Sequence, residues 1–446
     1  MQDRRDRMAI IGAGPVGLGM ARALKARGIA YDQLEADDDV GGNWYHGVYE
    51  TAHIISSRRT TEYADYPMPA DYPDFPSREQ MVDYLRDYTR HFALREHIEF
   101  GAKVVAVRPR ADELWDLGLA GGETRIYKGV LACNGHHWSK RYPDYPGRFA
   151  GAFIHSKDYR NPDQLLDKRV LVIGGGNSAC DVASEAARVG RSCDLSLRRG
   201  YWFLPKSLMG KPLVETMPLG TPVWLQRLML RVALRIVFGD YRKYGLPQPD
   251  HKIFEHHPTI NSELLHYVKH GRIRPRGDVK GFEGSRVDFV DGSSGEYDIV
   301  VCATGFHVDF PFLPQGMVPV TGGLAHVYGG SLLPGYKHLY IIGTMQPRYG
   351  FGPLVTLGGD LLADMIVLQD RMELPLGRVL KEMGQKPPAS HLINPADALR
   401  RMRRAKRLMP LMLPRAERKL RQRIARETPA FADAPLAWPN GDLQVY

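Results

Sequence analysis

Five short apolar runs along the chain have the length and the β-branched content of parallel strands that are buried on both faces. Each run ends in or next to a glycine turn, and two of them continue directly into helical patterns. Because strands that alternate with helices build parallel sheets, the pattern predicts an α/β protein with doubly wound sheets. The runs are residues 8–11, 129–135, 170–173, 298–305 and 338–342.

The run at 170–173 leads into a glycine turn and the start of a helix. Gly174, Gly176 and Ala179 fit the G-x-G-x-x-G/A pattern, whose glycines let the backbone turn and approach a ligand. We expect Asn177 or Ser178 to cap the helix. A helix N-terminus presents unpaired N–H groups that favour phosphate, so this segment predicts a dinucleotide site.

An earlier copy of this pattern lies near the N-terminus. A helix is expected over 15–27, and the strand expected over 30–34 ends at Glu35. A carboxylate about 20 positions past the glycines can accept a hydrogen bond from a ribose hydroxyl. The first turn contains Gly12, Gly14, Pro15, Val16 and Gly17.

The two patterns differ at the position that contacts the ribose. The strand expected over 193–197 ends in Arg198 and Arg199 instead of an acid. Arginine attracts the 2′-phosphate that a carboxylate repels. The first site therefore suits FAD or NAD and the second suits NADPH, with a solvated basic surface as the alternative role for the two arginines.

Further cofactor-binding candidates lie outside the glycine turns. A Gly-Gly-x-Trp loop brings backbone and an aromatic ring toward the first site. A three-stranded meander is expected over 98–107, 114–119 and 124–127, separate from the strand at 129–135. The candidates are Gly42, Asn43 and Trp44 of the loop, Val104 of the meander, and Gln346 just after the last buried run.

Composition fits a soluble globular protein of two or three domains, with 446 residues, 43% hydrophobic and 25% charged. The four cysteines are scattered without metal or redox spacing, no signal peptide is expected, and no uninterrupted apolar stretch approaches a membrane span. We therefore expect a cytoplasmic protein that needs no metal.

The net charge of +10 is confined to the tail, because residues 400–426 hold twelve Arg or Lys and one acid. A near-neutral body argues against nucleic-acid binding. The tail also carries an apolar run interrupted by Pro410 and Pro414. It fits an anionic membrane surface, a solvated basic helix or a contact in a homodimer, and these alternatives stay open.

Between the two glycine patterns stands the motif Phe149-x-Gly151-x-x-x-His155-x-x-x-Tyr159, and Cys302-Ala-Thr-Gly305-Phe306 follows later. With both nucleotide patterns, these motifs over residues 8–370 resemble the flavin-containing monooxygenases, a group that includes the Baeyer–Villiger enzymes. Tyr159 resembles the N- and S-oxidising branch, since the other branch usually carries Trp there. We expect His155 to position the domains.

The resemblance implies two Rossmann-like, three-layer domains. A FAD domain is expected from 1–165 and 300–446, with a NADPH domain inserted at 166–299. In the family, NADPH reduces FAD, O₂ adds to give a flavin hydroperoxide, and a small amine or sulfide takes one oxygen atom, as in N,N-dimethylaniline oxidation. A Baeyer–Villiger oxygenase on ketones, a pyridine-nucleotide reductase and a flavin-binding redox sensor or scaffold remain alternatives.

One loop departs from the family pattern. Ile55 stands where mammalian-type members carry Asn, and isoleucine cannot donate a hydrogen bond. Ser56, His53 or bound NADP⁺ would have to substitute, and we take Ser56 and Gln346 as the catalytic candidates. The resemblance then predicts a shorter-lived hydroperoxide than in Asn-bearing relatives, with a leaky oxidase as the alternative to such a substitution.

The substrate cavity is expected to form from two stretches. Residues 63–76 hold four prolines and are expected to be extended. The irregular insertion 201–270 contains an amphipathic helix expected over 222–238. A helix expected over 353–371 would direct its N-terminus at the flavin.

Overall fold

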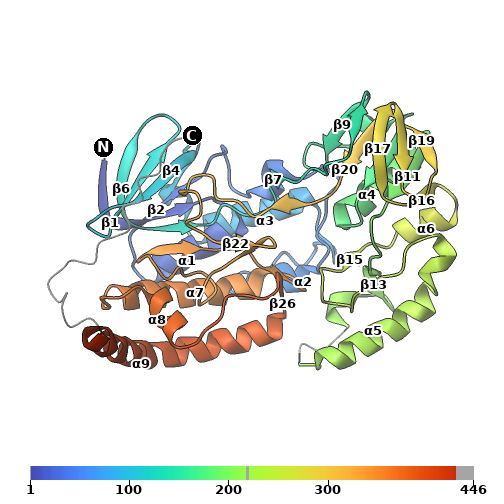
Figure 1. Cartoon of the computed structure of the whole chain (residues 1–446). Coiled ribbons are helices and arrows are strands. Elements are labelled where there is room, and N and C mark those ends of the chain that lie inside the picture. Colours follow the sequence, from blue (N-terminus) through green and yellow to red (C-terminus); the bar gives the residue numbers. More distant parts are fainter. Residues whose placement is uncertain (1, 217–219, 428–446) are drawn as a thin grey trace.

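The computed structural model describes residues 2–216 and 220–427, which form two lobes side by side (Figure 1). The first lobe is built on a sheet of order β3-β2-β1-β6-β5-β4, with β24 also pairing with β6. The central strands are parallel, whereas β4, β5 and β6 form an antiparallel meander. The first meander strand expected at 98–107 is split: residues 98–99 form β3, which pairs in parallel with β2 at the opposite edge of the sheet, and only β4 joins the meander. The strands are β1 (Gln2–Ile11), β2 (Tyr31–Leu34), β3 (Ile98–Glu99), β4 (Val104–Pro109), β5 (Trp115–Leu119), β6 (Thr124–Ala132) and β24 (Leu339–Ile341).

The bounds predicted for two further strands of this sheet are wrong. The strands expected at 124–127 and 129–135 are a single strand, β6, which pairs with β1 along both halves. In the sequence, Gly129 suggests a break between two strands. In the structure it allows close packing instead, because a Cβ on it would meet the side chains of Met8 and His338. The strand expected at 8–11 likewise begins earlier, at Gln2.

The second lobe contains a fully parallel sheet of order β16-β11-β10-β20-β9 and a smaller sheet of order β19-β18-β17-β8. The parallel sheet draws strands from positions 152 to 302, so β9 and most of β20 lie beyond the expected division at 166–299, which stays a prediction. The strands are β8 (Gly147–Phe149), β9 (Ala152–His155), β10 (Arg169–Ile173), β11 (Ser192–Ser196), β16 (Ile273–Arg276), β17 (Val279–Gly284), β18 (Arg286–Phe289), β19 (Ser294–Glu296) and β20 (Ile299–Cys302).

In Figure 1, helices α1, α7, α8 and α9 lie together on one side of the first sheet. In the first lobe α1 packs against α7, and in the second α4 follows β10 directly. The capping box of Ser77 and Gln80 opens α3. The helices are α1 (Pro15–Ala26), α2 (Arg58–Thr61), α3 (Arg78–His91), α4 (Asn177–Val189), α5 (Val223–Val237), α6 (Leu264–Lys269), α7 (Gly352–Gln369), α8 (Leu376–Glu382) and α9 (Pro395–Glu427).

Short strand pairs and helical turns connect these elements, several of them within the irregular insertion. The pairs are β12 (Phe203–Leu204) with β15 (Thr259–Ile260), β13 (Ser207–Leu208) with β14 (Lys211–Pro212), β7 (Ser139–Lys140) with β21 (Phe306–His307), β22 (Val320–Thr321) with β23 (Leu324–Ala325), and β25 (Gln346–Pro347) with β26 (Leu392–Ile393). The short turns are η1 (Asn43–Gly47), η2 (Arg95–His97), η3 (Pro162–Leu165), η4 (Leu213–Glu215) and η5 (Tyr241–Tyr244).

The basic tail is one continuous helix, α9, which runs through Pro410 and Pro414 and lies along α7 and α8 (Figure 1). Its inner face buries Leu413 and Leu420, and the carboxylate of Glu417 accepts a hydrogen bond from the Leu374 N–H at 2.7 Å. The tail is therefore docked on the first lobe.

Helix α7 departs from the expectation that no apolar stretch approaches a membrane span. By length and composition alone, its 18 residues are sufficient to cross a bilayer, and it is the one such helix among residues 2–216 and 220–427. However, 61% of that span is buried, and α7 packs against α1 and α9. Burial of this kind is what a core helix shows.

Candidate cofactor and substrate site

The first glycine turn forms a cradle without side chains. Gly12 has φ +103°, and a Cβ on it would lie 2.7 Å from the carbonyl oxygen of Cys133. A Cβ on Gly17 would meet the Gly12 carbonyl. Gly14 is the N-cap of α1 and receives no side-chain cap, so the first amides of this helix stay open to a ligand. Such a cradle at a helix N-terminus fits the phosphates of FAD.

Glu35 lies beside this turn, as predicted from its spacing. One carboxylate oxygen accepts the Ala13 N–H at 2.5 Å and the other accepts the Asp37 N–H at 3.0 Å. Burial raises the pKa of this carboxyl group. The Ala102 N–H donates to the Glu35 carbonyl at 2.8 Å, which brings the start of β4, with Val104, to the same end of the sheet.

The Gly-Gly-x-Trp loop also reaches the first turn. A Cβ on Gly42 would lie 2.9 Å from Cα of Gly14, so the two backbones pass in close contact. The Lys157 ammonium donates to Oδ1 of Asn43 at 2.7 Å, and burial lowers the pKa of Lys157 to about 8. Trp44 packs against the core of the first lobe. The loop and the turn are therefore brought together.

Gln346 lies against a pair of histidines that the sequence did not single out. Its side-chain N–H₂ group is 3.2 Å from Nε2 of His136 and 3.2 Å from Nε2 of His137. Nδ1 of His136 donates to the Gly343 carbonyl at 2.8 Å, which leaves Nε2 to accept from Gln346. Burial lowers the pKa of His136. The glycine turn that ends the 129–135 run was the only signal for this pair.

Ser56 belongs to a different hydrogen-bond group. Its hydroxyl is 2.6 Å from the hydroxyl of Thr61, and the adjacent Ser57 caps α2. The loop between Gln346 and α7 packs on α2, because a Cβ on Gly350 would meet the Thr60 carbonyl. The two predicted catalytic residues therefore stand on neighbouring loops without a hydrogen bond between their described side chains.

The other donor considered for this loop, His53, is already engaged. Its Nε2 contacts the Lys206 ammonium, and its Nδ1 faces the Thr51 carbonyl at 3.3 Å. Ile55 packs against the apolar cluster of the insertion. Both side-chain substitutes for the family asparagine are therefore engaged, His53 with Lys206 and Ser56 with Thr61.

The second glycine turn repeats the design of the first. Gly174 has φ +127°, and a Cβ on it would meet the Ala303 carbonyl. Gly176 faces open space and is the N-cap of α4, which corrects the prediction that Asn177 or Ser178 caps this helix. Asn177 accepts the Ile260 N–H at 2.7 Å instead, and Ala179 is fully buried.

Basic and aromatic side chains lie beside the second turn. The ring of Tyr201 lies where a Cβ on Gly175 would be, and the Arg199 guanidinium is 5.4 Å from the centre of that ring. Arg198 and Arg199 are exposed. Exposed guanidinium groups next to an open helix N-terminus fit a dinucleotide with an extra phosphate, as NADPH has.

Two residues of the motif at 149–159, His155 and Tyr159, make hydrogen bonds that hold the structure together. His155 is fully buried; its Nδ1 accepts the Lys157 N–H at 3.1 Å, so its Nε2 donates to the Gly305 carbonyl at 3.0 Å. The Tyr159 hydroxyl donates to the carboxylate of Glu185 on α4. These contacts tie the linker to the loop after β20 and to α4, which supports a positioning role for His155.

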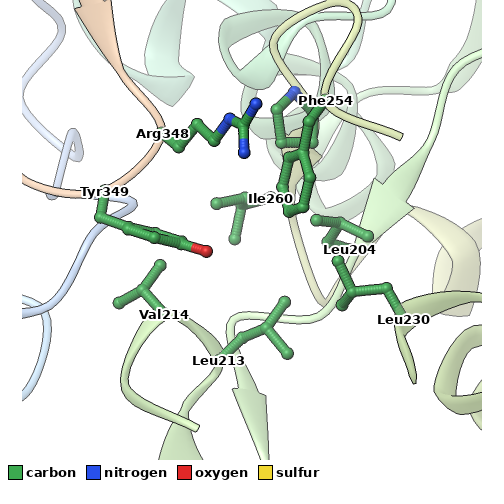
Figure 2. A pocket seen from close by; sticks show the side chains of 9 residues that line it. Leu204, Leu213, Val214, Leu230, Phe254, Ile260, Arg348 and Tyr349 are labelled. Atoms are coloured by element: carbon green, nitrogen blue, oxygen red, sulfur yellow. The ribbon is translucent and has the colours of Figure 1, made fainter. Parts of the chain in front are cut away.

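An apolar pocket opens between the insertion and the loop before α7 (Figure 2). Its cavity volume is about 20 Å³, which is room for about one water molecule and far below the range for small-molecule sites. The Tyr349 hydroxyl donates to Oε1 of Gln226 at 3.2 Å. The pocket is lined by Leu204, Leu213, Val214, Leu230, Phe254, Pro258, Ile260, Arg348 and Tyr349. Arg348 and Tyr349 carried no signal in the sequence.

Known proteins match this chain along most of its length. The model of the flavin-binding monooxygenase-like family matches residues 5–407. Flavin-containing monooxygenase 5 of Oryctolagus cuniculus is 32% identical over 383 residues, which cover 79% of this chain and 71% of that protein. The N-oxide-forming dimethylaniline monooxygenase 2 of Rattus norvegicus is 30% identical, covering 79% and 71%. A solved flavin-containing monooxygenase from Stenotrophomonas maltophilia has a TM-score of 0.63 at 22% identity, covering 82% of this chain and 99% of that chain.

Two glycine cradles at helix N-termini, one beside an acid and one beside arginines, define an enzyme with two dinucleotide sites. The chain belongs to the flavin-binding monooxygenase-like family. It is a NADPH- and O₂-dependent monooxygenase, and its cofactors are FAD and NADPH.

Proposed function

We propose that the enzyme transfers one oxygen atom of O₂ to the nitrogen of an amine or the sulfur of a sulfide. The observation that carries the proposal is the pair of open helix N-termini behind Gly14 and Gly176, which suit FAD and NADPH, in a chain that the flavin-binding monooxygenase-like family model matches over residues 5–407. The name of the rat relative, an N-oxide-forming dimethylaniline monooxygenase, adds support.

The proposed reaction balances without a protein nucleophile. The lone pair of the substrate forms the new bond to oxygen, the second oxygen atom leaves as water, and NADPH supplies two electrons as a hydride while solvent supplies a proton. When bound, FAD and NADPH supply the oxygen activation and the hydride. The protein has to bind and orient the cofactors and the substrate, and it has to exclude water.

Three side chains are proposed to do this near the pocket. Gln346 is oriented by two imidazole nitrogens, and the Ser56 hydroxyl, which pairs with that of Thr61, lies on the neighbouring loop. Both are proposed as the hydrogen-bond donors of the reaction site. Ile55 keeps water out and donates no hydrogen bond, so oxygen transfer is expected to compete with release of H₂O₂.

A substrate panel under ¹⁸O₂ tests the proposal. A thioether, a tertiary amine and a ketone are each incubated with enzyme and NADPH, and the product masses are measured by mass spectrometry. One labelled oxygen in the sulfoxide or N-oxide is expected. An ester from the ketone alone would point to Baeyer–Villiger chemistry. NADPH oxidation without labelled product would point to a reductase, and no oxidation to a redox sensor or scaffold.

We also propose that the enzyme is cytoplasmic and that α9 makes a peripheral contact with anionic membranes. All four cysteines are buried free thiols, which suits a reducing compartment. Exposed Leu408, Leu411 and Met412 lie among the arginines of α9. Salt-sensitive sedimentation with phosphatidylserine vesicles is expected. A concentration-dependent dimer without vesicle binding would contradict the membrane contact.

A further inference from the structure

One segment of the chain crosses from the first glycine turn into the core of the second lobe. Its start, Gly42, packs against Gly14 of the first turn. The ring of Tyr49 is buried in the apolar core around α4, whereas Ile54 belongs to the core of the first lobe. Residues 42–54, called the crossing segment below, therefore join the FAD side of the molecule to the NADPH side.

Two carboxylates on α4 hold the crossing segment. The Tyr49 hydroxyl donates to Oδ2 of Asp181 at 2.7 Å, and the Thr51 hydroxyl donates to Oε1 of Glu185. Asp181 and Glu185 lie about one helical turn apart, so their carboxylates are on the same face of α4. Burial and Asp181 raise the pKa of Tyr49 well above its ordinary value, so its hydroxyl keeps the proton that it donates. Two directed hydrogen bonds therefore attach the segment to the helix.

The other donors to these two carboxylates come from the second lobe itself. The Asn261 amide donates to Oδ1 of Asp181 at 2.8 Å, and the Tyr159 hydroxyl donates to Oε2 of Glu185. Across residues 2–216 and 220–427, neither carboxylate forms an ion pair with an Arg, Lys or His side chain. Glu185 is only 5% exposed, so neutral donors alone satisfy a buried charge. Because apolar side chains could stabilise the contact as well, the carboxylates contribute direction more than stability.

We propose that Asp181 and Glu185 are positioning residues for hydride transfer between the two cofactors. Helix α4 begins at the second glycine turn, and the crossing segment begins against the first. The two hydrogen bonds between helix and segment therefore fix the NADPH cradle relative to the FAD cradle. The inference does not depend on which substrate is oxidised.

The step that this alignment serves moves one hydride, with its two electrons, from NADPH to FAD and leaves NADP⁺ and reduced FAD. Hydride transfer needs the reacting atoms in contact. A misplacement of about 1 Å can slow such a step on the order of 100-fold. Two hydrogen bonds that set the distance between the cradles are therefore expected to affect the rate of reduction more than the binding of either cofactor.

Hydroxyl deletions in the crossing segment test this role. Tyr49→Phe/Thr51→Val removes both hydrogen bonds to α4 and little else. In anaerobic stopped-flow experiments with the FAD-loaded enzyme, the rate constant of flavin reduction at saturating NADPH should fall at least about tenfold, whereas the Kd for NADPH should stay within about threefold. Thr51→Ser keeps the hydroxyl and should keep the rate constant of the unaltered enzyme.

Tyr159→Phe is the matched control for Thr51→Val. It also removes one hydroxyl donor from Glu185, but Tyr159 lies in the core of the second lobe, outside the crossing segment. Both variants should lose a similar amount of Tm, because each leaves Glu185 one donor short. Only Thr51→Val should slow flavin reduction, and the rate constant of Tyr159→Phe should stay within about twofold of the unaltered enzyme.

Two measurements without turnover separate positioning from nucleotide binding. Isothermal titration uses 2′,5′-ADP, which carries the extra phosphate of NADPH but no nicotinamide, and its Kd should agree within about twofold among all variants. Hydrogen exchange of the FAD-loaded enzyme reports the attachment of the crossing segment directly. Exchange in residues 49–54 should be faster in Tyr49→Phe/Thr51→Val and unchanged in Tyr159→Phe.

The outcomes separate this inference from the proposed function. An unchanged rate constant in Tyr49→Phe/Thr51→Val would overturn the inference. Equal slowing in Tyr159→Phe and Thr51→Val would assign the network to stability, and a loss of 2′,5′-ADP affinity with the slower reduction would assign it to the second cradle, so either result would also overturn it. Slower reduction in the double variant, with no oxygenated product from the unaltered enzyme, would uphold the positioning role and refute the oxygen transfer.

Discussion

At the residue scale, each dinucleotide site depends on a glycine whose backbone conformation suits no other residue. Gly12 and Gly174 both have φ above +100°, and both face a carbonyl oxygen of the adjacent strand or loop. A side chain at either position must therefore displace backbone. The sequence pattern identified both positions because the requirement is local.

Gly174→Ala should disturb the second site alone. The strained φ and the clash with the Ala303 carbonyl should shift the turn and raise the KM for NADPH at least about tenfold. The FAD content should stay unchanged, since the first turn lies in the other lobe. Gly121→Ala is the control, because a Cβ there meets nothing within 4 Å. An unchanged KM in Gly174→Ala would show that the turn does not hold NADPH.

Ile55→Asn should improve the coupling of NADPH oxidation to oxygen transfer. The amide would restore a hydrogen-bond donor in the loop beside Ser56, at some cost in stability because Ile55 packs against an apolar cluster. The ratio of oxygenated product to NADPH consumed should rise, and H₂O₂ should fall. Ile55→Leu keeps the apolar contact and serves as the control. A higher H₂O₂ yield in Ile55→Asn would contradict the role given to this position.

At the element scale, the strand–turn–helix units were predictable because strand, glycine turn and helix are contiguous in the chain. The helix cap was not, since a tertiary contact with Ile260 takes the Asn177 side chain away from the helix. Gly129 misled for a similar reason. The absence of a Cβ on Gly129 allows close packing against His338, which directly precedes β24 and is far away in the sequence. No local pattern indicates such a contact.

The contact between β9 and the loop after β20 should be sensitive to pH. His155 accepts a hydrogen bond at Nδ1, and burial lowers its pKa below the ordinary value of 6.5. The unfolded chain therefore binds more protons below about pH 6.5, and the free energy of unfolding should fall as the pH drops through that region.

Urea unfolding at pH 7.5 and pH 5.5 checks this prediction. The unaltered enzyme should lose stability between the two values, and His155→Gln should be less stable at pH 7.5 but lose less on acidification. The exposed His46 gives the matched control His46→Gln. If His155→Gln loses as much stability as the unaltered enzyme, His155 does not carry this proton linkage.

At the scale of the whole molecule, the site assembles residues from separated parts of the chain. The sequence patterns indicated both glycine cradles, Glu35 and the two arginines, which follow the turns at fixed distances. The imidazole pair was missed because the histidines meet Gln346 only in the fold, and Arg348 was missed because it lines a pocket between the insertion and the loop before α7. No periodicity in the sequence reports a pocket between segments so far apart in the chain.

The central claim is that one lobe holds FAD and the other delivers the hydride of NADPH to it. Anaerobic stopped-flow reduction of the FAD-loaded enzyme tests this most directly, by the bleaching of the flavin absorbance with NADPH and with NADH. The account predicts clearly faster bleaching with NADPH, and loss of that preference in Arg198→Ala/Arg199→Ala. Equal rates with both nucleotides, or purified enzyme that takes up no FAD, would contradict it.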